Sequence, residues 1–231
     1  MHKYLLITFL FILQNQLISQ NNFQYKLRPP KINIENPPVV ILLHGYGSDE
    51  EDLFSLAQYF PDRFLVISLR APIRLPQGGF AWYNLDYSTG KINYQLKEHN
   101  NAVQQVLEFI HQFSKQQRFD QSQIYLCGFS QGGIISYSLA LQNPGSFKGI
   151  AVMSGRLVEE IKSNITPSAK LNKLKIFISH GTKDDVLPVQ GARDARDYLK
   201  KIGLSASYHE YAAHHEINEA MLNDLLKWLK E

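Results

Sequence analysis

A serine stands between two glycines in the segment Gly-Phe-Ser-Gln-Gly at residues 128–132. An apolar run at 124–127 precedes it, and an apolar run with helical character follows at 134–142. In such a strand–turn–helix context G-x-S-x-G presents a serine as a nucleophile, because the glycines permit a sharp turn with close packing behind it. The start of the following helix would offer N–H groups to an oxyanion. The pattern predicts that Ser130 is the nucleophile of an acyl transfer.

A serine hydroxyl is a weak nucleophile at neutral pH, so it needs a base and an acid that orients the base. Asp184 and Asp185 follow an apolar run at 175–179, and His214 and His215 follow an alternating run further on. The order Ser, Asp, His is that of the α/β-hydrolase triad. Both pairs lie just past the ends of expected strands, where active sites of open α/β sheets gather. Chemistry alone allows either member of each pair.

Six segments carry motifs in a fixed order. They are LLHGYGSDEEDL at 42–53, RAP at 70–72, GGFAWY at 78–83, GFSQG at 128–132, HGTKD at 180–184 with Pro188, and YAAHHEI at 211–217. With these motifs the chain resembles the bacterial phospholipase/carboxylesterase family, the small single-domain serine esterases related to acyl-protein thioesterases. The resemblance runs from about residue 23 to the C-terminus.

The resemblance implies a role for particular residues of the site. It places the acid on Asp184 and the base on His215, although His214 stands where the family usually has a glycine. It also implies that the backbone N–H groups of Tyr46 and Gln131 form the oxyanion hole, where hydrogen bonds stabilise the developing charge.

Trp82 lies in a loop that the resemblance places near the acyl pocket. We therefore expect Trp82 in the wall of that pocket, with a place in the core as the alternative. His44 and His180 are expected to be structural, hydrogen-bonded residues. The acids at 49–52 are interpreted as charges in the first turn of a helix rather than as metal ligands.

Composition is typical of a globular protein, with 44% hydrophobic and 19% charged residues in a chain of 231. The net charge of +3 is modest, and in the most basic helical stretch Asp194 and Asp197 alternate with the cations. Nucleic-acid binding is therefore not expected. The sequence has no phosphate loop, dinucleotide fingerprint or cysteine-based metal motif, so we expect no cofactor and no metal.

Short apolar runs alternate with segments of helical period. The runs that predict buried strands are 39–43, 64–68, 124–127, 149–153 and 175–179, and the segments that predict helices include 49–60, 101–114, 189–202 and 217–229. This alternation predicts a single α/β domain. The resemblance implies the α/β-hydrolase fold, with a mostly parallel central sheet and helices on both faces. We expect no large lid, because no inserted segment is long enough to form one.

The first residues differ from the rest of the chain. A basic start is followed by an apolar run at 4–13, which is too short to span a bilayer but fits the apolar region of a signal peptide. Ser19 is a small residue of the kind that precedes a signal-peptide cleavage site. We predict a signal peptide at 1–19, a catalytic domain at 20–231, and a secreted or periplasmic protein without stable membrane insertion. The alternative is a short uncleaved helix associated with a membrane.

Residues and resemblance together predict a serine hydrolase that cleaves carboxylic esters or thioesters with small to medium acyl groups, through an acyl-enzyme on Ser130. The expected partner is a small-molecule ester, and a homodimer is compatible with the resemblance. Two alternatives are a serine peptidase on the same fold and a non-catalytic binding protein. The presence of Ser, Asp and His in the required order favours an enzyme over the binding protein, and nothing in the sequence favours the peptidase, which could use the same triad.

Overall fold

The computed structural model describes residues 23–86, 88 and 93–231. The predicted signal peptide at 1–19 lies outside these residues, so that segment and the export it implies stay predictions. Within the described ranges, none of the helices combines the length and apolarity that crossing a bilayer requires.

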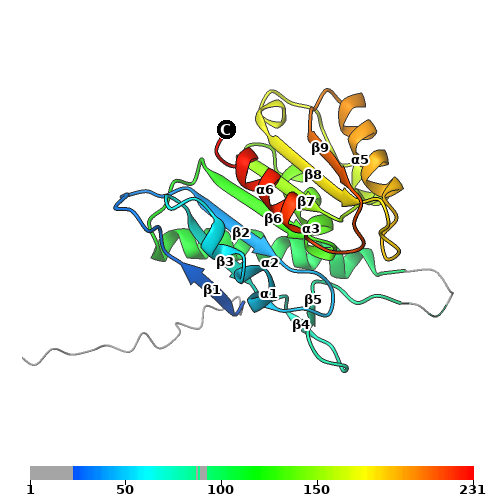
Figure 1. The fold of residues 1–231 in the computed structure, drawn as a ribbon, viewed down its shortest axis with the longest axis horizontal. Coiled ribbons are helices and arrows are strands. Elements are labelled where there is room, and N and C mark those ends of the chain that lie inside the picture. Colours follow the sequence, from blue (N-terminus) through cyan, green and yellow to red (C-terminus); the bar gives the residue numbers. More distant parts are fainter. Residues whose placement is uncertain (1–22, 87, 89–92) are drawn as a thin grey trace, which may run out of the picture.

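A seven-stranded sheet forms the centre of the molecule (Figure 1). Its strands lie in the order β1-β3-β2-β6-β7-β8-β9, and only β1 at one edge runs antiparallel to its neighbour. Their bounds are β1 Tyr25–Arg28, β2 Val39–Leu43, β3 Leu65–Leu69, β6 Ile124–Phe129, β7 Gly149–Met153, β8 Lys175–Gly181 and β9 Ser207–Tyr211. The predicted mostly parallel sheet is confirmed.

Alternate residues of the central strands pack against opposite faces of the sheet. In β2, Val39, Ile41 and Leu43 belong to one apolar cluster, whereas Val40 and Leu42 belong to the other. Because both faces are covered, every residue of β2 is buried. This explains why the strand has a continuous apolar run in the sequence instead of an alternating one.

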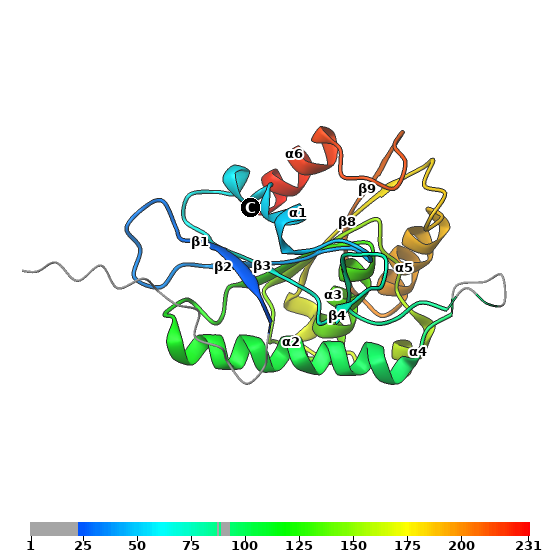
Figure 2. The same ribbon diagram turned by 90° about the horizontal axis from the view of Figure 1, so that it is seen from below.

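Helices cover both faces of the sheet, as predicted (Figure 2). The clusters place α2, α3 and α5 on one face and α1 and α6 on the other. The helices are α1 Glu50–Phe54, α2 Leu96–Gln116, α3 Gln131–Gln142, α4 Glu159–Lys162, α5 Gln190–Lys201 and α6 Glu219–Trp228.

Some boundaries differ from those expected from the sequence. The helix expected at 49–60 is a short α1 followed by a separate 3₁₀ turn at Ala57–Tyr59. After α1 ends at Phe54, the hydroxyl of Ser55 donates to the backbone carbonyl of Asp52. The strand β1 and the small hairpin of β4 (Ile73–Arg74) and β5 (Phe80–Ala81) were not predicted, since so few residues carry little periodicity.

A buried polar contact joins α2 to α3. His99 of α2 is fully buried, and its Nε2 lies 3.0 Å from the Oγ of Ser138 on α3. Burial lowers the pKa of His99, because the apolar interior penalises the charged imidazolium. The folded protein therefore holds this ring in the neutral form near pH 7.

Replacing His99 with Gln is expected to weaken the acid dependence of stability. The pKa of His99 is lower in the folded than in the unfolded chain, so between these values only the unfolded chain binds the proton. The free energy of unfolding thus falls as the pH drops below about 6.5, by at most ~1.4 kcal/mol per pH unit from this group. Urea unfolding between about pH 7.5 and about pH 5 measures this slope, which should be smaller in His99→Gln.

His111→Gln is the matched control, because His111 lies on the same helix and is exposed. Its slope should equal that of the wild type. A slope that is also unchanged in His99→Gln would contradict the assignment of a depressed pKa to the buried ring.

Candidate active site

Ser130 occupies a sharp turn between β6 and α3. Its backbone has φ 52° and ψ −116°, a strained conformation for a residue with a side chain, and α3 begins at the next residue. Its N–H donates to the carbonyl of Met153 at 2.9 Å. Behind the turn, a Cβ on Gly132 would lie 1.9 Å from the carbonyl oxygen of Leu43, so only glycine fits where α3 packs against the end of β2.

Ser130, His215 and Asp184 form a hydrogen-bonded series. Ser130 Oγ lies 2.9 Å from His215 Nε2, and His215 Nδ1 lies 2.7 Å from Asp184 Oδ2. An ionised carboxylate only accepts, so Nδ1–H donates to Asp184 and Nε2 accepts from the serine hydroxyl. The neighbouring Asp185 and His214 are exposed. The structure thus brings together the members of each pair that the resemblance indicated.

The carboxylate of Asp184 is buried and has several donors. Its Oδ1 accepts from the N–H groups of Val186 and Leu187 at 3.0 and 2.8 Å. Its Oδ2 lies 3.2 Å from Nε2 of the buried His180, which also lies 2.7 Å from the carbonyl of Leu187. Both neighbours of this nitrogen accept, so His180 carries its proton on Nε2. These donors offset the cost of burying the carboxylate beside His215.

The turn that carries Asp184 packs against the loop that carries His215. A Cβ on Gly181 would lie 2.3 Å from the carbonyl oxygens of both Ala213 and His214. The N–H of Lys183 donates to the carbonyl of Ala213 at 3.0 Å. Backbone contact of this kind fixes the distance between the acid and the imidazole.

The loop after β2 lies beside Ser130. A Cβ on Gly45 would lie 3.4 Å from the Cβ of Ser130. Within the described part of the chain, neither the N–H of Tyr46 nor that of Gln131 donates to a backbone carbonyl. Their assignment as oxyanion donors stays a prediction.

His44 fixes the conformation of this loop. Its Nδ1 donates to the carbonyl of Gly45 at 2.7 Å, and its Nε2 accepts from the N–H of Ala71 at 3.0 Å. Burial lowers the pKa of His44 and keeps the ring neutral, as this pair of bonds requires. Trp82 is 1% exposed, and its indole N–H donates to the carbonyl of His44 at 2.9 Å.

The side chain of Gln131 holds the loop of Trp82, a contact that sequence reasoning missed. Its Oε1 accepts from the N–H of Trp82 at 2.9 Å, and its Nε2 donates to the carbonyl of Tyr83 at 2.8 Å. Contact between His180 and Asp184 was missed in the same way. The spacing of the H-G-x-x-D motif was a possible signal, because it places this histidine four residues before the acid.

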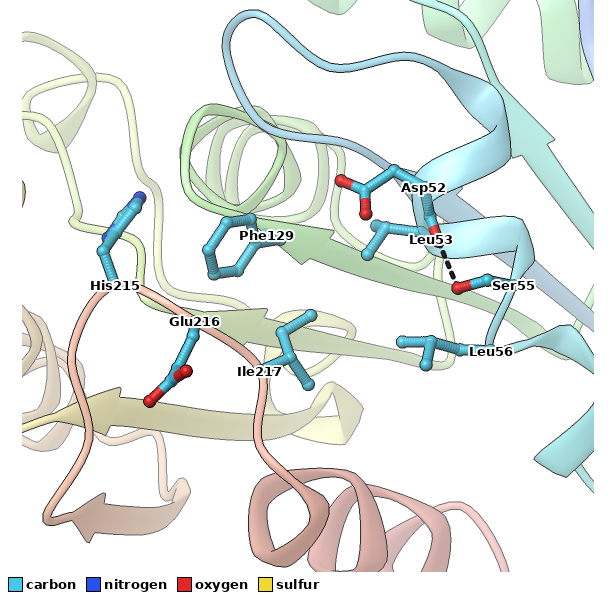
Figure 3. Close-up of a pocket in the computed structure, with 8 residues that line it drawn as sticks. All are labelled: Asp52, Leu53, Ser55, Leu56, Phe129, His215, Glu216 and Ile217. Atoms are coloured by element: carbon cyan, nitrogen blue, oxygen red, sulfur yellow. Dashed lines mark hydrogen bonds between the residues drawn. The ribbon is translucent and has the colours of Figure 1, made fainter.

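A pocket of about 380 Å³ lies next to His215 (Figure 3). Its lining comes from α1 and the turn after it, from the end of β6, and from the segment before α6; the residues are Asp52, Leu53, Ser55, Leu56, Phe129, His215, Glu216 and Ile217. Trp82 is not part of this lining, so its contact with substrate stays a prediction.

The acids at the start of α1 have structural roles. Asp49 caps the helix by accepting from the N–H of Glu51. Glu50 pairs with Arg70, and Glu51 pairs with Lys26. In the described ranges no group of three or more His, Cys, Asp or Glu side chains is arranged to hold a metal ion.

Comparison with known proteins identifies the family. The sequence profile of the phospholipase/carboxylesterase family matches residues 33–231. The chain belongs to this family. A "Probable carboxylesterase" of Oryza sativa subsp. japonica is 26% identical over 84% of this chain and 77% of its own length. Acyl-protein thioesterase 1 of Emericella nidulans is 24% identical over 82% of this chain and 88% of its own.

A solved structure agrees with this assignment. The crystal structure of esterase PE8 superimposes with a TM-score of 0.78 at 27% identity, and the match covers 90% of this chain and 98% of that one. The fold of this phospholipase/carboxylesterase family member is therefore the α/β-hydrolase fold, as the resemblance implied.

Replacing Gly181 with Ala is expected to separate His215 from Ser130. The added Cβ would collide with two carbonyl oxygens of the histidine loop, so that loop must move. A displacement of about 1 Å can cost ~10²-fold in rate. The rate of labelling of Ser130 by a fluorophosphonate probe measures this effect and should fall by about that factor.

Ser179→Ala is the matched control in the same strand, because the Ser179 hydroxyl is buried without a hydrogen-bond partner among the described residues. Its labelling rate should stay near that of the wild type. Normal labelling of a folded Gly181→Ala protein would show that the histidine loop tolerates the extra methyl group.

Proposed function

We propose that this protein is a serine hydrolase that cleaves carboxylic esters or thioesters with small to medium acyl groups. The observation that carries the proposal is the hydrogen-bonded series Asp184–His215–Ser130, in a chain that belongs to the phospholipase/carboxylesterase family. The names of the relatives, a carboxylesterase and an acyl-protein thioesterase, support the same class of reaction.

In the first half of the reaction Ser130 Oγ attacks the carbonyl carbon of the substrate. His215 Nε2, 2.9 Å away, takes the hydroxyl proton as the new bond forms. Asp184 holds Nδ1–H in place and stabilises the imidazolium. The N–H groups of Tyr46 and Gln131 would bind the oxyanion of the tetrahedral intermediate.

Collapse of this intermediate releases the alcohol or thiol. His215 Nε2–H gives its proton to the leaving oxygen or sulfur, and the acyl group remains on Ser130. A water molecule then attacks the acyl-enzyme while His215 takes its proton. The second tetrahedral intermediate collapses to the free acid, and the proton returns to Ser130 Oγ.

Replacing Ser130 with Ala is expected to lower kcat for p-nitrophenyl butyrate by at least ~10³-fold, because the acyl-enzyme can no longer form. Fluorophosphonate labelling of the wild type, followed by peptide mapping, should place the label on Ser130. Near-normal turnover by a folded Ser130→Ala protein would contradict the mechanism. Absence of labelling in a folded wild type would instead favour the non-catalytic binding protein.

Asp185 and His214, the chain neighbours of the proposed acid and base, provide matched controls for them. His215→Ala and Asp184→Ala should each lower kcat by at least ~10²-fold, whereas His214→Ala and Asp185→Ala should change it by less than about fivefold. The reason is geometric, since only the first two side chains lie in the hydrogen-bonded series and the other two are exposed. Equal losses in His214→Ala and His215→Ala would leave the base unassigned. Rates on matched amides and esters would test the peptidase alternative.

A further inference from the structure

The pocket beside His215 combines apolar walls with negative charge. Leu53, Leu56 and Ile217 form aliphatic walls, and the ring of Phe129 faces the same space (Figure 3). Among the residues that the structure describes, its acidic lining residues are Asp52 and Glu216, and no lysine or arginine is part of the lining. Such a surface is complementary to a ligand group that has an apolar hydrocarbon part and a positive charge.

The two carboxylates differ from their neighbours in the same region in how they are paired. Within the described residues, neither Asp52 nor Glu216 takes part in an ion pair, whereas Glu50 and Glu51 of the same helix α1 do. Asp52 accepts a hydrogen bond at 2.7 Å from the neutral hydroxyl of Ser48. In Figure 3 the carboxylate of Asp52 is turned toward Phe129, whereas the side chain of Glu216, next to His215 in the chain, points away from Phe129. The pocket therefore carries a local negative charge.

The position of the pocket indicates which part of a substrate it holds. In the proposed mechanism His215 Nε2–H must reach the leaving oxygen or sulfur. His215 forms one wall of the pocket, and Glu216 and Ile217, which follow it in the chain, form the adjoining wall. The ring of Phe129 lies 4.9 Å from the ring of His215, centroid to centroid. A leaving group within reach of His215 therefore lies next to one wall of this pocket.

We infer that this pocket binds the alcohol or thiol part of the substrate and favours one that carries an alkylammonium group. The inference rests on the proposed function. The face of Phe129 would attract the cation, as aromatic rings attract quaternary ammonium groups, and Asp52 would add a direct charge attraction. The aliphatic walls would bury the methyl and methylene groups.

A pair of esters that differ in one charge tests the inference. Butyrylcholine and 3,3-dimethylbutyl butyrate share the acyl group and the shape of the alcohol, but only the first is cationic. The quantity measured is the ratio of their kcat/KM values. It should fall about threefold in Asp52→Asn, and about fivefold or more in Asp52→Asn/Glu216→Gln, because exposed charge pairs of this kind contribute modestly. The ratio of the wild type should also fall when the ionic strength is raised.

The variants are chosen so that folding does not decide the result. Asn at position 52 can still accept from the Ser48 hydroxyl, and Gln at position 216 replaces an exposed side chain of the same shape. Because the measured quantity is a ratio of two esters, any loss of activity that both esters share cancels from it. Glu35→Gln is the matched control, because it removes one negative charge from an exposed pair with Arg118. Its ratio should be that of the wild type.

The outcomes separate the inference from the proposed function. Hydrolysis of both esters with the same ratio in the wild type and the double variant would overturn the inference alone. So would turnover of p-nitrophenyl butyrate without turnover of either ester. Failure to hydrolyse any of the three esters would contradict the proposed function, and the inference with it.

Discussion

Close contact of backbone with backbone at the carboxyl ends of β2, β6 and β8 is the constraint on which the rest of the site depends. At the end of β6 the chain turns through a strained Ser130 directly into α3. The first turn of that helix lies against the carbonyl of Leu43, so closely that position 132 has no room for any side chain. At the end of β8, Gly181 meets the carbonyls of Ala213 and His214 in the same way. Strain in the serine turn persists because the surrounding packing leaves it no alternative.

Buried polar side chains stabilise these contacts. His44 joins the loop after β2 to the backbone at Ala71, and Gln131 joins the start of α3 to the loop of Trp82 and Tyr83. His180 donates beside Asp184 and so supports the carboxylate that orients His215. Each of these side chains lies in the interior, where hydrogen bonds offset the cost of burying polar atoms, and the bonds that they make also fix the loops.

The electrostatic environment differs between the two sides of the site. On the interior side the burial of His44 lowers its pKa and keeps its ring uncharged, while the carboxylate of Asp184 is fully supplied with donors. On the side of α1, Asp52 and Glu216 line a pocket to which no lysine or arginine of the described residues contributes. Chemistry at Ser130 would therefore take place between a tightly packed interior and a negatively charged opening. This difference in charge is a physical basis for selection among leaving groups.

The sequence by itself determined the class of fold and the residue types of the site. Continuous apolar runs predict buried strands because both faces of the sheet are covered, and glycines on both sides of Ser130 predict the sharp turn. By residue type alone, Asp184 and Asp185 were equally suitable as the acid, and His214 and His215 were equally suitable as the base. Only the tertiary structure turned one of each pair inward, because the direction of a side chain in a turn depends on the segment that packs against it. The contacts of Gln131 with the loop of Trp82, and the charged pocket between α1 and the histidine loop, likewise join segments far apart in the chain. Such contacts arise from the packing of whole elements, so no local pattern of residues encodes them.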